Sequence, residues 1–128
     1  MNLPSLKKEI ITRFALAPTL EQLKDNQLII VTSFGIISGT LANEINDIDF
    51  DDRNQVSIAV LGKLTGNIIS EYKKSNSIDE DQLLEGNDGC IPLVDVVVKT
   101  STATFNLHFL NVFYDQIIGV TIGNVQSN

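Results

Sequence analysis

The stretch VTSFGIISGTLA, residues 31–42, places two glycines in a run of apolar and β-branched residues. Val, Ile and Thr favour the extended backbone of a β-strand, and Gly35 can adopt the positive φ that a tight turn requires. A glycine inside a strand, as at Gly39, marks a bulge or a bend where two backbones come close together. We therefore predict two antiparallel strands within residues 27–45, joined at the SFG turn and bent at Gly39.

The same glycines do not form a phosphate-binding loop. The segment FGIISG matches neither the G-x-G-x-x-G pattern nor the G-x-x-x-x-G-K-[ST] pattern of nucleotide-binding proteins. In both patterns the glycines lead into a helix whose N-terminus binds the phosphate, and no such helix start follows Gly39. The sequence therefore predicts no nucleotide cofactor, and it predicts no other cofactor.

The segment before this hairpin has the pattern of an amphipathic helix. Leu6, Ile10 and Phe14 recur every four positions between basic residues, and Ser5 is a suitable N-cap. We predict a helix over residues 5–15.

Three strand candidates follow in residues 91–123, namely IPLVDVVVK, ATFNLHFLNV and IIGVTIG. In the middle candidate, apolar residues alternate with polar ones from Phe105 to Phe109, but Leu110 and Val112 then fall on the polar face. Alternate residues of a strand face opposite sides of a sheet. The strand is therefore predicted to change the layer it packs against near Leu110, and to bend there.

The middle of the chain, residues 46–88, differs from both ends. An acidic loop, NDIDFDDRN, precedes apolar residues spaced every four positions from Val56 to Tyr72, and two lysines follow them. This spacing predicts a helix over residues 54–74, with charges placed as the helix dipole favours. A second glycine-bent hairpin is the alternative, because the spacing of Gly35 and Gly39 recurs at Gly62 and Gly66.

Composition predicts a single globular domain over residues 1–128, located in the cytoplasm. The length suits one hydrophobic core, the single cysteine agrees with a reducing compartment, and no stretch has the pattern of a signal peptide or a spanning helix. A net charge of −7 opposes non-specific binding to nucleic acid or anionic lipid. We therefore predict no membrane partner, and RNA binding only through a local basic patch.

The reactive residue types predict neither an enzyme nor a metal site. His108 is the only histidine, and no ligand spacing joins it to Cys90. The run DIDFDD alternates like a calcium loop, but it has Asp52 where that loop requires Gly and is followed by Ile58 where the loop requires Glu. No grouping supplies a nucleophile with an acid and a base, so we predict no catalytic residues.

Three segments resemble motifs of the Sm-like family. SFGIISGTL resembles the first motif through Gly35, Gly39 and Leu41, and LVD resembles the strand that closes this motif through Leu93 and Asp95. VFYDQIIGV is similar in apolar spacing to the second motif, with aliphatic positions at Val112, Ile117 and Val120.

The resemblance covers residues 5–45 and 90–123 and leaves the middle as an insertion between the second and third strands. It implies an α+β, mainly β fold in which an N-terminal helix precedes a five-stranded, strongly bent antiparallel barrel of the Sm-like or SH3-like kind. It also implies assembly of copies into a ring. The chain departs from the family where RNA bases are held, with Phe113 and Tyr114 in place of Arg-Gly and Cys90 in place of Asn, so it supports the fold more than RNA binding.

The leading functional hypothesis is a non-enzymatic assembly module that forms a homo-oligomeric ring. The last strand, IIGVTIG, carries no charge or proline to discourage edge pairing, so we predict that it pairs with an edge of another copy. The predicted oligomer edge consists of Ile117, Ile118, Val120 and Ile122. A weak RNA affinity is assigned to phosphate-facing Lys7, Lys8 and Arg13, and aromatic contacts with bases or a neighbouring subunit are assigned to Phe113 and Tyr114.

The alternative is a monomeric SH3-like interaction domain that binds a basic peptide or protein and no nucleic acid. It would use Phe113 and Tyr114 together with the acidic insertion, and the net charge of −7 favours it. A free last strand in a monomer favours this alternative, and an intersubunit sheet favours the ring.

Overall fold

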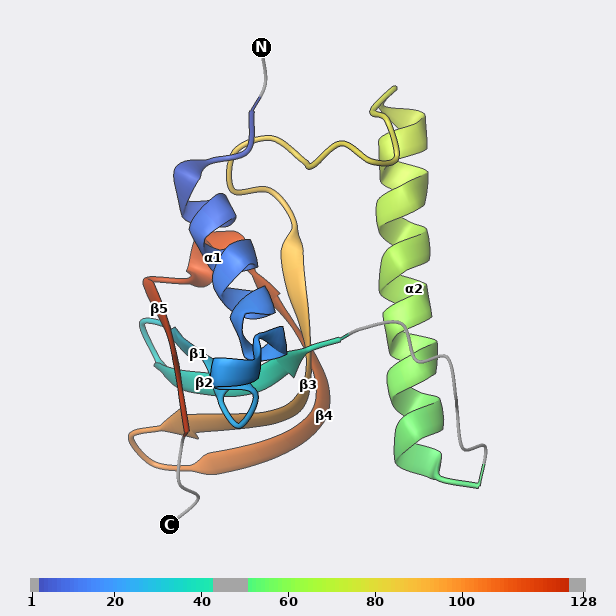
Figure 1. The fold of residues 1–128 in the computed structure, drawn as a ribbon. Coiled ribbons are helices and arrows are strands. Elements are labelled where there is room, and N and C mark those ends of the chain that lie inside the picture. Colours follow the sequence, from blue (N-terminus) through green and yellow to red (C-terminus); the bar gives the residue numbers. More distant parts are fainter. Residues whose placement is uncertain (1–2, 43–50, 125–128) are drawn as a thin grey trace.

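A five-stranded antiparallel sheet and two α-helices make up the fold of residues 3–42 and 51–124, which the computed structural model describes (Figure 1). The predicted α+β class with mainly sheet content is confirmed. The elements are, in chain order, α1 (Leu6–Leu16), the 3-10 helices η1 (Ala17–Thr19) and η2 (Glu21–Leu23), β1 (Gln27–Val31), β2 (Gly35–Leu41), α2 (Arg53–Ser75), β3 (Cys90–Thr100), β4 (Thr104–Phe113), η3 (Tyr114–Gln116) and β5 (Gly119–Gly123).

The predicted hairpin is present as β1 and β2. Thr32 closes its turn, because its backbone N–H donates to the Gly35 carbonyl (2.9 Å) and its hydroxyl accepts from the Gly35 N–H (3.2 Å). Gly35 does not adopt a positive φ. A Cβ at this position would lie 2.2 Å from the Lys99 carbonyl oxygen of β3, so glycine is required here by the close approach of two backbones.

Gly39 lies at the predicted bend. The register between β2 and β3 shifts between Ser38 and Thr40, and a Cβ on Gly39 would lie 3.2 Å from the Val94 carbonyl oxygen. On β3 the neighbouring Asp95 has a φ of +52°. An extra residue in one strand bends it and increases its twist, and β3 and β4 curve strongly in Figure 1.

The side of β4 that faces the core changes along the strand. Its inward residues are Phe105 and Leu107 in the first half and Leu110 and Val112 in the second, because each of these lies opposite a buried residue of β3. The two halves meet beside Asp95. The predicted change near Leu110 is confirmed, and the irregularity of β3 is its cause.

The sheet has the strand order β4-β3-β2-β1-β5 and is not closed into a barrel. β5 pairs with β1, with Val31 opposite Gly119, and β4 pairs with β3 along its length. Within the described residues β4 and β5 do not pair with each other, so each end of the sheet is a free edge. The predicted bent barrel is therefore present only as an open sheet, because η3 leads the chain from the end of β4 to the uncovered edge of β1.

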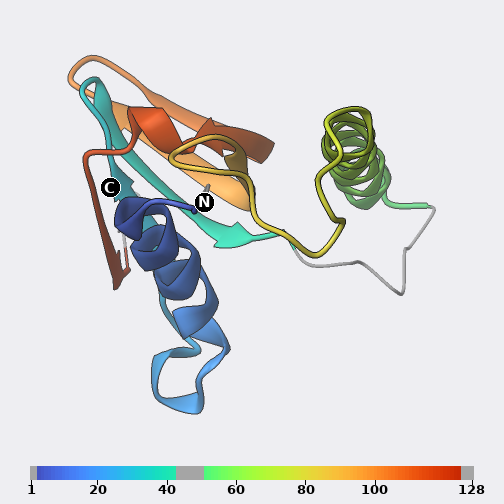
Figure 2. The same cartoon turned by 90° about the horizontal axis from the view of Figure 1, so that it is seen from above.

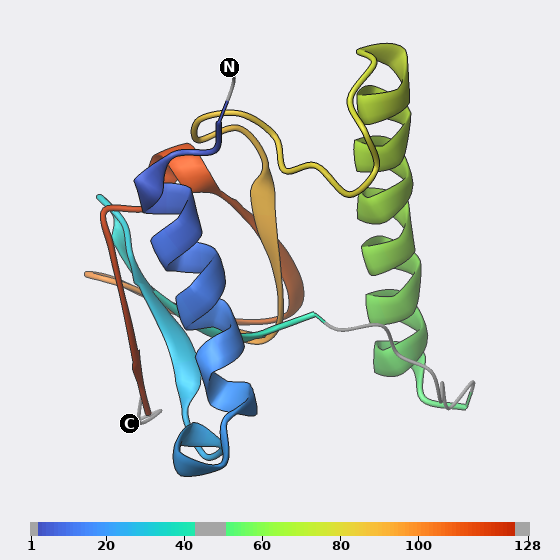
Figure 3. The same ribbon diagram turned by 45° about the horizontal axis from the view of Figure 1, so that its top comes forward.

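α1 covers one face of the sheet, and the core lies between them (Figures 2 and 3). Ser5 caps the helix as predicted, since its hydroxyl accepts from the Lys8 N–H (3.0 Å). The side chains that α1 buries are Lys8, Ile11 and Ala15. Because one of these buried residues is a lysine, a search for apolar spacing in the sequence does not identify this face of the helix as the buried one. The apolar stripe that predicted the helix is exposed instead and consists of Leu6, Ile10 and Phe14.

α2 is a helix, as predicted, and the alternative of a second hairpin is wrong. Asp52 caps it by accepting from the Asn54 N–H (2.9 Å), and Lys73 and Lys74 lie in its last turn. Among the described residues, no helix combines the length and the apolar composition that crossing a membrane requires.

α2 packs on the outer face of the sheet, which we define as the face opposite α1. The outward residues of β4 make the contact: the Asn111 amide donates to the Thr65 hydroxyl (2.9 Å), and a Cβ on Gly62 would lie 3.9 Å from the Phe109 ring. No described side chain of α2 is buried, so the helix is held to the sheet along one line only.

The segment between α2 and β3, residues 76–89, has no regular structure and is tied to the N-terminal segment. The Gly86 N–H donates to the Leu3 carbonyl (2.8 Å), and the Ser5 N–H donates to the Gly86 carbonyl (3.0 Å). Residues 43–50, which include the end of the predicted second strand and most of the acidic loop, lie outside the described residues.

Candidate functional site

Two free strand edges at opposite ends of one sheet form the main candidate site. β5, with the sequence GVTIG, contains no charged residue or proline, and β4 offers a ten-residue edge on the other side. The unpaired N–H and C=O groups of such edges can hydrogen-bond to a further strand. The site is therefore one of main-chain recognition, with side chains on either face of the sheet to give it specificity.

An apolar groove of about 430 Å³ lies between α1 and the start of β5. β5 runs beside α1 in Figures 1 and 3, so a strand added to the β5 edge would pass this groove. Its lining is aliphatic except for one lysine and consists of Leu6, Lys7, Ile10, Ile11, Ile117, Ile118, Gly119 and Val120.

The predicted oligomer edge is only partly the observed one. Val120 and Ile122 belong to β5 and pack against the core while partly exposed. Ile118 lies just before the strand and is 69 % exposed. Ile117 was predicted as an edge residue, but it is a core residue with 2 % of its surface exposed. η3 turns Ile117 inward beneath α1, so it is not available to a partner.

Two apolar residues of the opposite edge were missed by the sequence analysis. Phe105 and Leu107 face the same side as the core, yet both are exposed, because β4 is the last strand on its side of the sheet. The alternation of β4 indicated their inward direction. That β4 lies at an edge follows from the strand order, and the alternation of apolar and polar residues in one strand does not predict the strand order.

Lys7, Lys8 and Arg13 do not form the predicted phosphate-facing surface. Lys8 is buried, with 2 % of its surface exposed, Lys7 lines the apolar groove, and Arg13 is exposed elsewhere on the helix. Successive residues of a helix are rotated by about 100°, so these three positions point in three directions. The assignment of Lys8 to RNA is wrong.

Lys8 connects α1 to the linker that follows α2, residues 76–89. Its Nζ donates to the Leu84 carbonyl (2.7 Å) and lies 5.3 Å from the centre of the Tyr114 ring. Burial lowers the pKa of Lys8, while the Asp88 carboxylate acts in the opposite direction. A carbonyl oxygen and an aromatic face both stabilise a buried ammonium group, so the structure gives Lys8 a packing role.

Phe113 and Tyr114 have different surroundings and do not form one aromatic surface. Phe113 is exposed at the end of β4, whereas Tyr114 is buried in the core. Burial, with a smaller contribution from Cys90, raises the pKa of Tyr114 to about 12. Burial also raises the pKa of the Cys90 thiol, which favours its protonated form. The assignment of Tyr114 to a partner contact is therefore wrong, and Phe113 alone is accessible.

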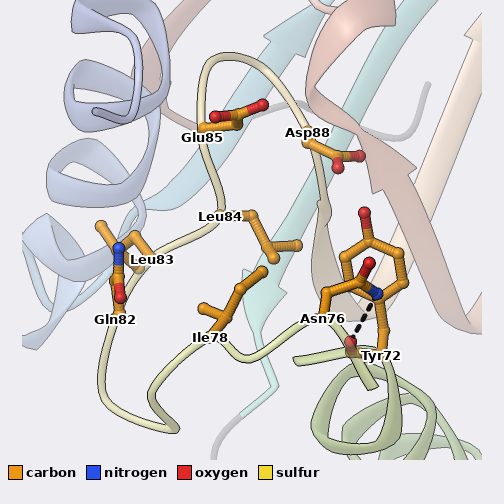
Figure 4. A pocket seen from close by; sticks show the side chains of 8 residues that line it. All are labelled: Tyr72, Asn76, Ile78, Gln82, Leu83, Leu84, Glu85 and Asp88. Carbon is orange, nitrogen blue, oxygen red and sulfur yellow. Dashed lines mark hydrogen bonds between the residues drawn. The ribbon is translucent and has the colours of Figure 1, made fainter. Parts of the chain in front are cut away.

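A separate pocket of about 250 Å³ lies between the end of α2 and the linker (Figure 4). The Asn76 side chain donates to the Tyr72 carbonyl (2.8 Å) on its rim. The two charged side chains of the lining, Glu85 and Asp88, are both acidic, so the pocket suits a cationic group. The rest of the lining consists of Tyr72, Asn76, Ile78, Gln82, Leu83 and Leu84.

The reactive residue types are dispersed. His108 is exposed on β4, and Cys90 is a free, half-buried thiol at the start of β3. Within residues 3–42 and 51–124, no three His, Cys, Asp or Glu side chains lie close enough together to hold a metal ion.

No protein-family model, curated protein or solved structure matches this chain. The resemblance to the Sm-like family stays a prediction, and a proposal of function depends on the edges, the groove and the pocket.

Proposed function

We propose that this protein is a non-enzymatic, Sm-like assembly module of the cytoplasm whose copies form a homo-oligomeric ring. The observation that carries the proposal is the pair of free edges, β4 and β5, at opposite ends of one strongly bent sheet. When two different surfaces of identical copies bind each other, the contact repeats until a ring closes or a filament grows. Curvature of the sheet turns each added copy and favours closure.

The side chains at the two edges support this pairing. On β4, Phe105 and Leu107 are exposed on the core side of the sheet. On β5, Val120 and Ile122 lie on the same side and are only partly buried. In an antiparallel pair that places Leu107 beside Val120 of the next copy, these residues form one apolar layer, and the groove beside α1 lies next to it.

The oligomeric mass tests the ring. Each copy has a mass of 14.1 kDa, and we expect size-exclusion chromatography with light scattering to give a discrete multiple of this mass at micromolar concentration. The double variant Phe105→Lys and Leu107→Lys should be monomeric, because both positions tolerate a charge in the free chain but not beneath a paired strand. Leu20→Lys, an exposed position between η1 and η2, is the matched control and should assemble. A monomeric wild type would contradict the ring.

RNA binding is not part of the proposed module, which we take to be a scaffold. Lys8 is buried, and the net charge of −7 opposes the phosphate backbone. Fluorescence anisotropy with a labelled RNA oligomer in about 50 mM salt should show no binding. An affinity that falls steeply with salt and is lost in Lys7→Ala with Arg13→Ala would restore the RNA function.

A second candidate function is the capture of a basic peptide by the monomer, and the pocket in Figure 4 favours it. Asp88 lies near the Tyr72 ring in this pocket, and Glu85 lies across from it. Carboxylates with an aromatic face suit a Lys or Arg side chain. Calorimetric titration with a Lys-rich peptide tests it. Binding by a monomeric wild type that Glu85→Gln with Asp88→Asn abolishes would favour this function over the ring.

A further inference from the structure

Helix α2 leaves a continuous apolar flank uncovered. Leu61, Leu64 and Ile68 are 40 %, 53 % and 57 % exposed, and no charged residue interrupts the flank on the helix surface that these three share. A helix with an apolar stripe normally buries it. Since α2 contacts its own sheet mainly through Gly62 and Thr65, this flank has no partner within the described chain.

The uncovered flank points past the free edge of β4. Gly62 lies beside Phe109 and Thr65 beside Asn111, so α2 runs in the same direction as β4. An α-helix is right-handed and turns about 100° per residue. With Gly62 and Thr65 both facing the sheet, Leu61 and Ile68 therefore point sideways, on the side of β4 away from β3. Leu64 lies next to them and is turned further from the sheet. Figure 2, which looks down α2, shows the helix beside the outer face of these two strands.

The β5 edge of the chain has a matching surface on its outer face. Gly119 faces outward there, and a Cβ added to it would meet only the Val31 Cβ, at 4.0 Å. Val31 lies opposite both Gly119 of β5 and Ile36 of β2, and Val31 and Ile36 are exposed. The bare glycine, Val31 beside it and Ile36 on the far side of Val31 form a shallow apolar seat, which we call the outer seat.

The edge contact alone is small for a stable assembly. β5 has five residues, so a strand paired to it covers a strip about 17 Å long and about 5 Å wide. Stable protein interfaces bury about 800 Å² on each partner. A ring built on this edge therefore needs further buried area close to β4, and the flank of α2 is an apolar surface in that position.

We propose that α2 docks its flank of Leu61, Leu64 and Ile68 on the outer seat of the neighbouring copy, so that each helix bridges two copies. The proposal rests on the ring proposed above. When β5 of the next copy pairs with β4 so that Leu107 lies beside Val120, Gly119 at the start of that β5 lies opposite His108, one residue before Phe109, which α2 covers. The insertion then acts as a clamp across the subunit boundary.

Site-specific cross-linking between two differently labelled chains tests the clamp. One chain carries Cys90→Ser with Leu64→Cys, and the other carries Cys90→Ser with Val31→Cys. After mixing and refolding, a short bis-maleimide should join them into a covalent dimer that neither chain forms alone. Replacing Leu64→Cys by Leu20→Cys, which is also exposed, should remove the product. Absence of the mixed dimer would overturn the proposal. So would a cross-link that forms only inside a third chain, which carries both Leu64→Cys and Val31→Cys.

A substitution in the seat provides a second measurement that does not depend on a cross-link. Gly119→Val is expected to fit the isolated chain, because a Cβ there meets only the Val31 Cβ, at 4.0 Å, and valine favours strands. We expect an unchanged circular dichroism spectrum and at least a tenfold higher dissociation concentration of the oligomer. Gly66→Ala, a position with nothing within 4 Å, is the control. Unweakened assembly of Gly119→Val would contradict the clamp.

The outcomes separate the clamp from the ring. A wild type that assembles, dissociates on Phe105→Lys with Leu107→Lys, and shows neither the cross-link nor the Gly119→Val effect retains the ring and loses the clamp. A wild type that is monomeric loses both.

Discussion

Lys8 shows how neighbours determine the role of a single residue. In the sequence it belongs to a basic pair, Lys7 and Lys8, and is indistinguishable from a surface charge. In the structure it occupies a core position, with a hydrogen bond to the Leu84 carbonyl and the Tyr114 ring beneath it. Leu84 and Tyr114 lie far from Lys8 in the sequence, so no local pattern could identify these partners.

Stability should depend on pH through Lys8. Its pKa in the folded chain lies below the ordinary value of 10.5 because of burial. The unfolded chain therefore binds the proton more tightly, and stability rises with pH until the pH exceeds 10.5. Relative to Lys8→Met, which keeps an apolar stem without the charge, the wild type should gain free energy of unfolding as the pH rises through the lowered folded-state pKa towards 10.5. Urea unfolding of both proteins measures this, and a difference that stays constant or falls with pH contradicts it.

At the scale of elements, local periodicity identified the helices and strands, but it did not identify what each of them buries. The predicted helix at residues 54–74 was found as α2 (Arg53–Ser75), and the predicted N-cap Ser5 was found at α1. The inward face of α1 was not predicted, because burial of Lys8 makes it less apolar than the exposed stripe. Periodicity reports that a helix is amphipathic, whereas its orientation on a sheet depends on the shape of the sheet.

Gly35 and Gly66 should respond oppositely to alanine. Gly35→Ala would place a Cβ 2.2 Å from a backbone oxygen of β3, and overpacking that moves backbone costs about 1–3 kcal/mol. Gly66→Ala has open space within 4 Å and should stabilise α2 by about 1 kcal/mol, because alanine favours helices. Urea titrations of the two variants measure the difference, and equal effects at both positions would argue against this assignment of the glycines.

At the scale of the whole molecule, the strand order decides which surfaces are free. Phe105, Leu107 and Val120 would all be interior in a closed barrel, and they are exposed or partly exposed because β4 and β5 end the sheet on opposite sides. The same order brings the flank of α2 to the β4 edge. An open sheet with two apolar edges is a liability in a monomer, and the proposed assembly would remove it.

Assembly should make thermal stability depend on protein concentration. Any process that binds folded chains to one another stabilises them by mass action, so the Tm of the wild type should rise with each tenfold increase in concentration. Phe105→Lys with Leu107→Lys should show one Tm throughout. Circular dichroism melts over the accessible range measure this, and a wild-type Tm independent of concentration would be evidence against assembly.

The sequence by itself determined the elements of this protein: a helix, a glycine-bent hairpin, a second helix and three further strands. Each follows from side-chain spacing and from residues such as Ser5 and Asp52 that act within a few positions of themselves. Only the tertiary structure decided that the sheet stays open, that Lys8 and Tyr114 are buried, and which apolar side chains are left at the edges. Those outcomes depend on contacts between residues that are far apart in the chain. The free energies of such contacts cannot be inferred from a local sequence pattern.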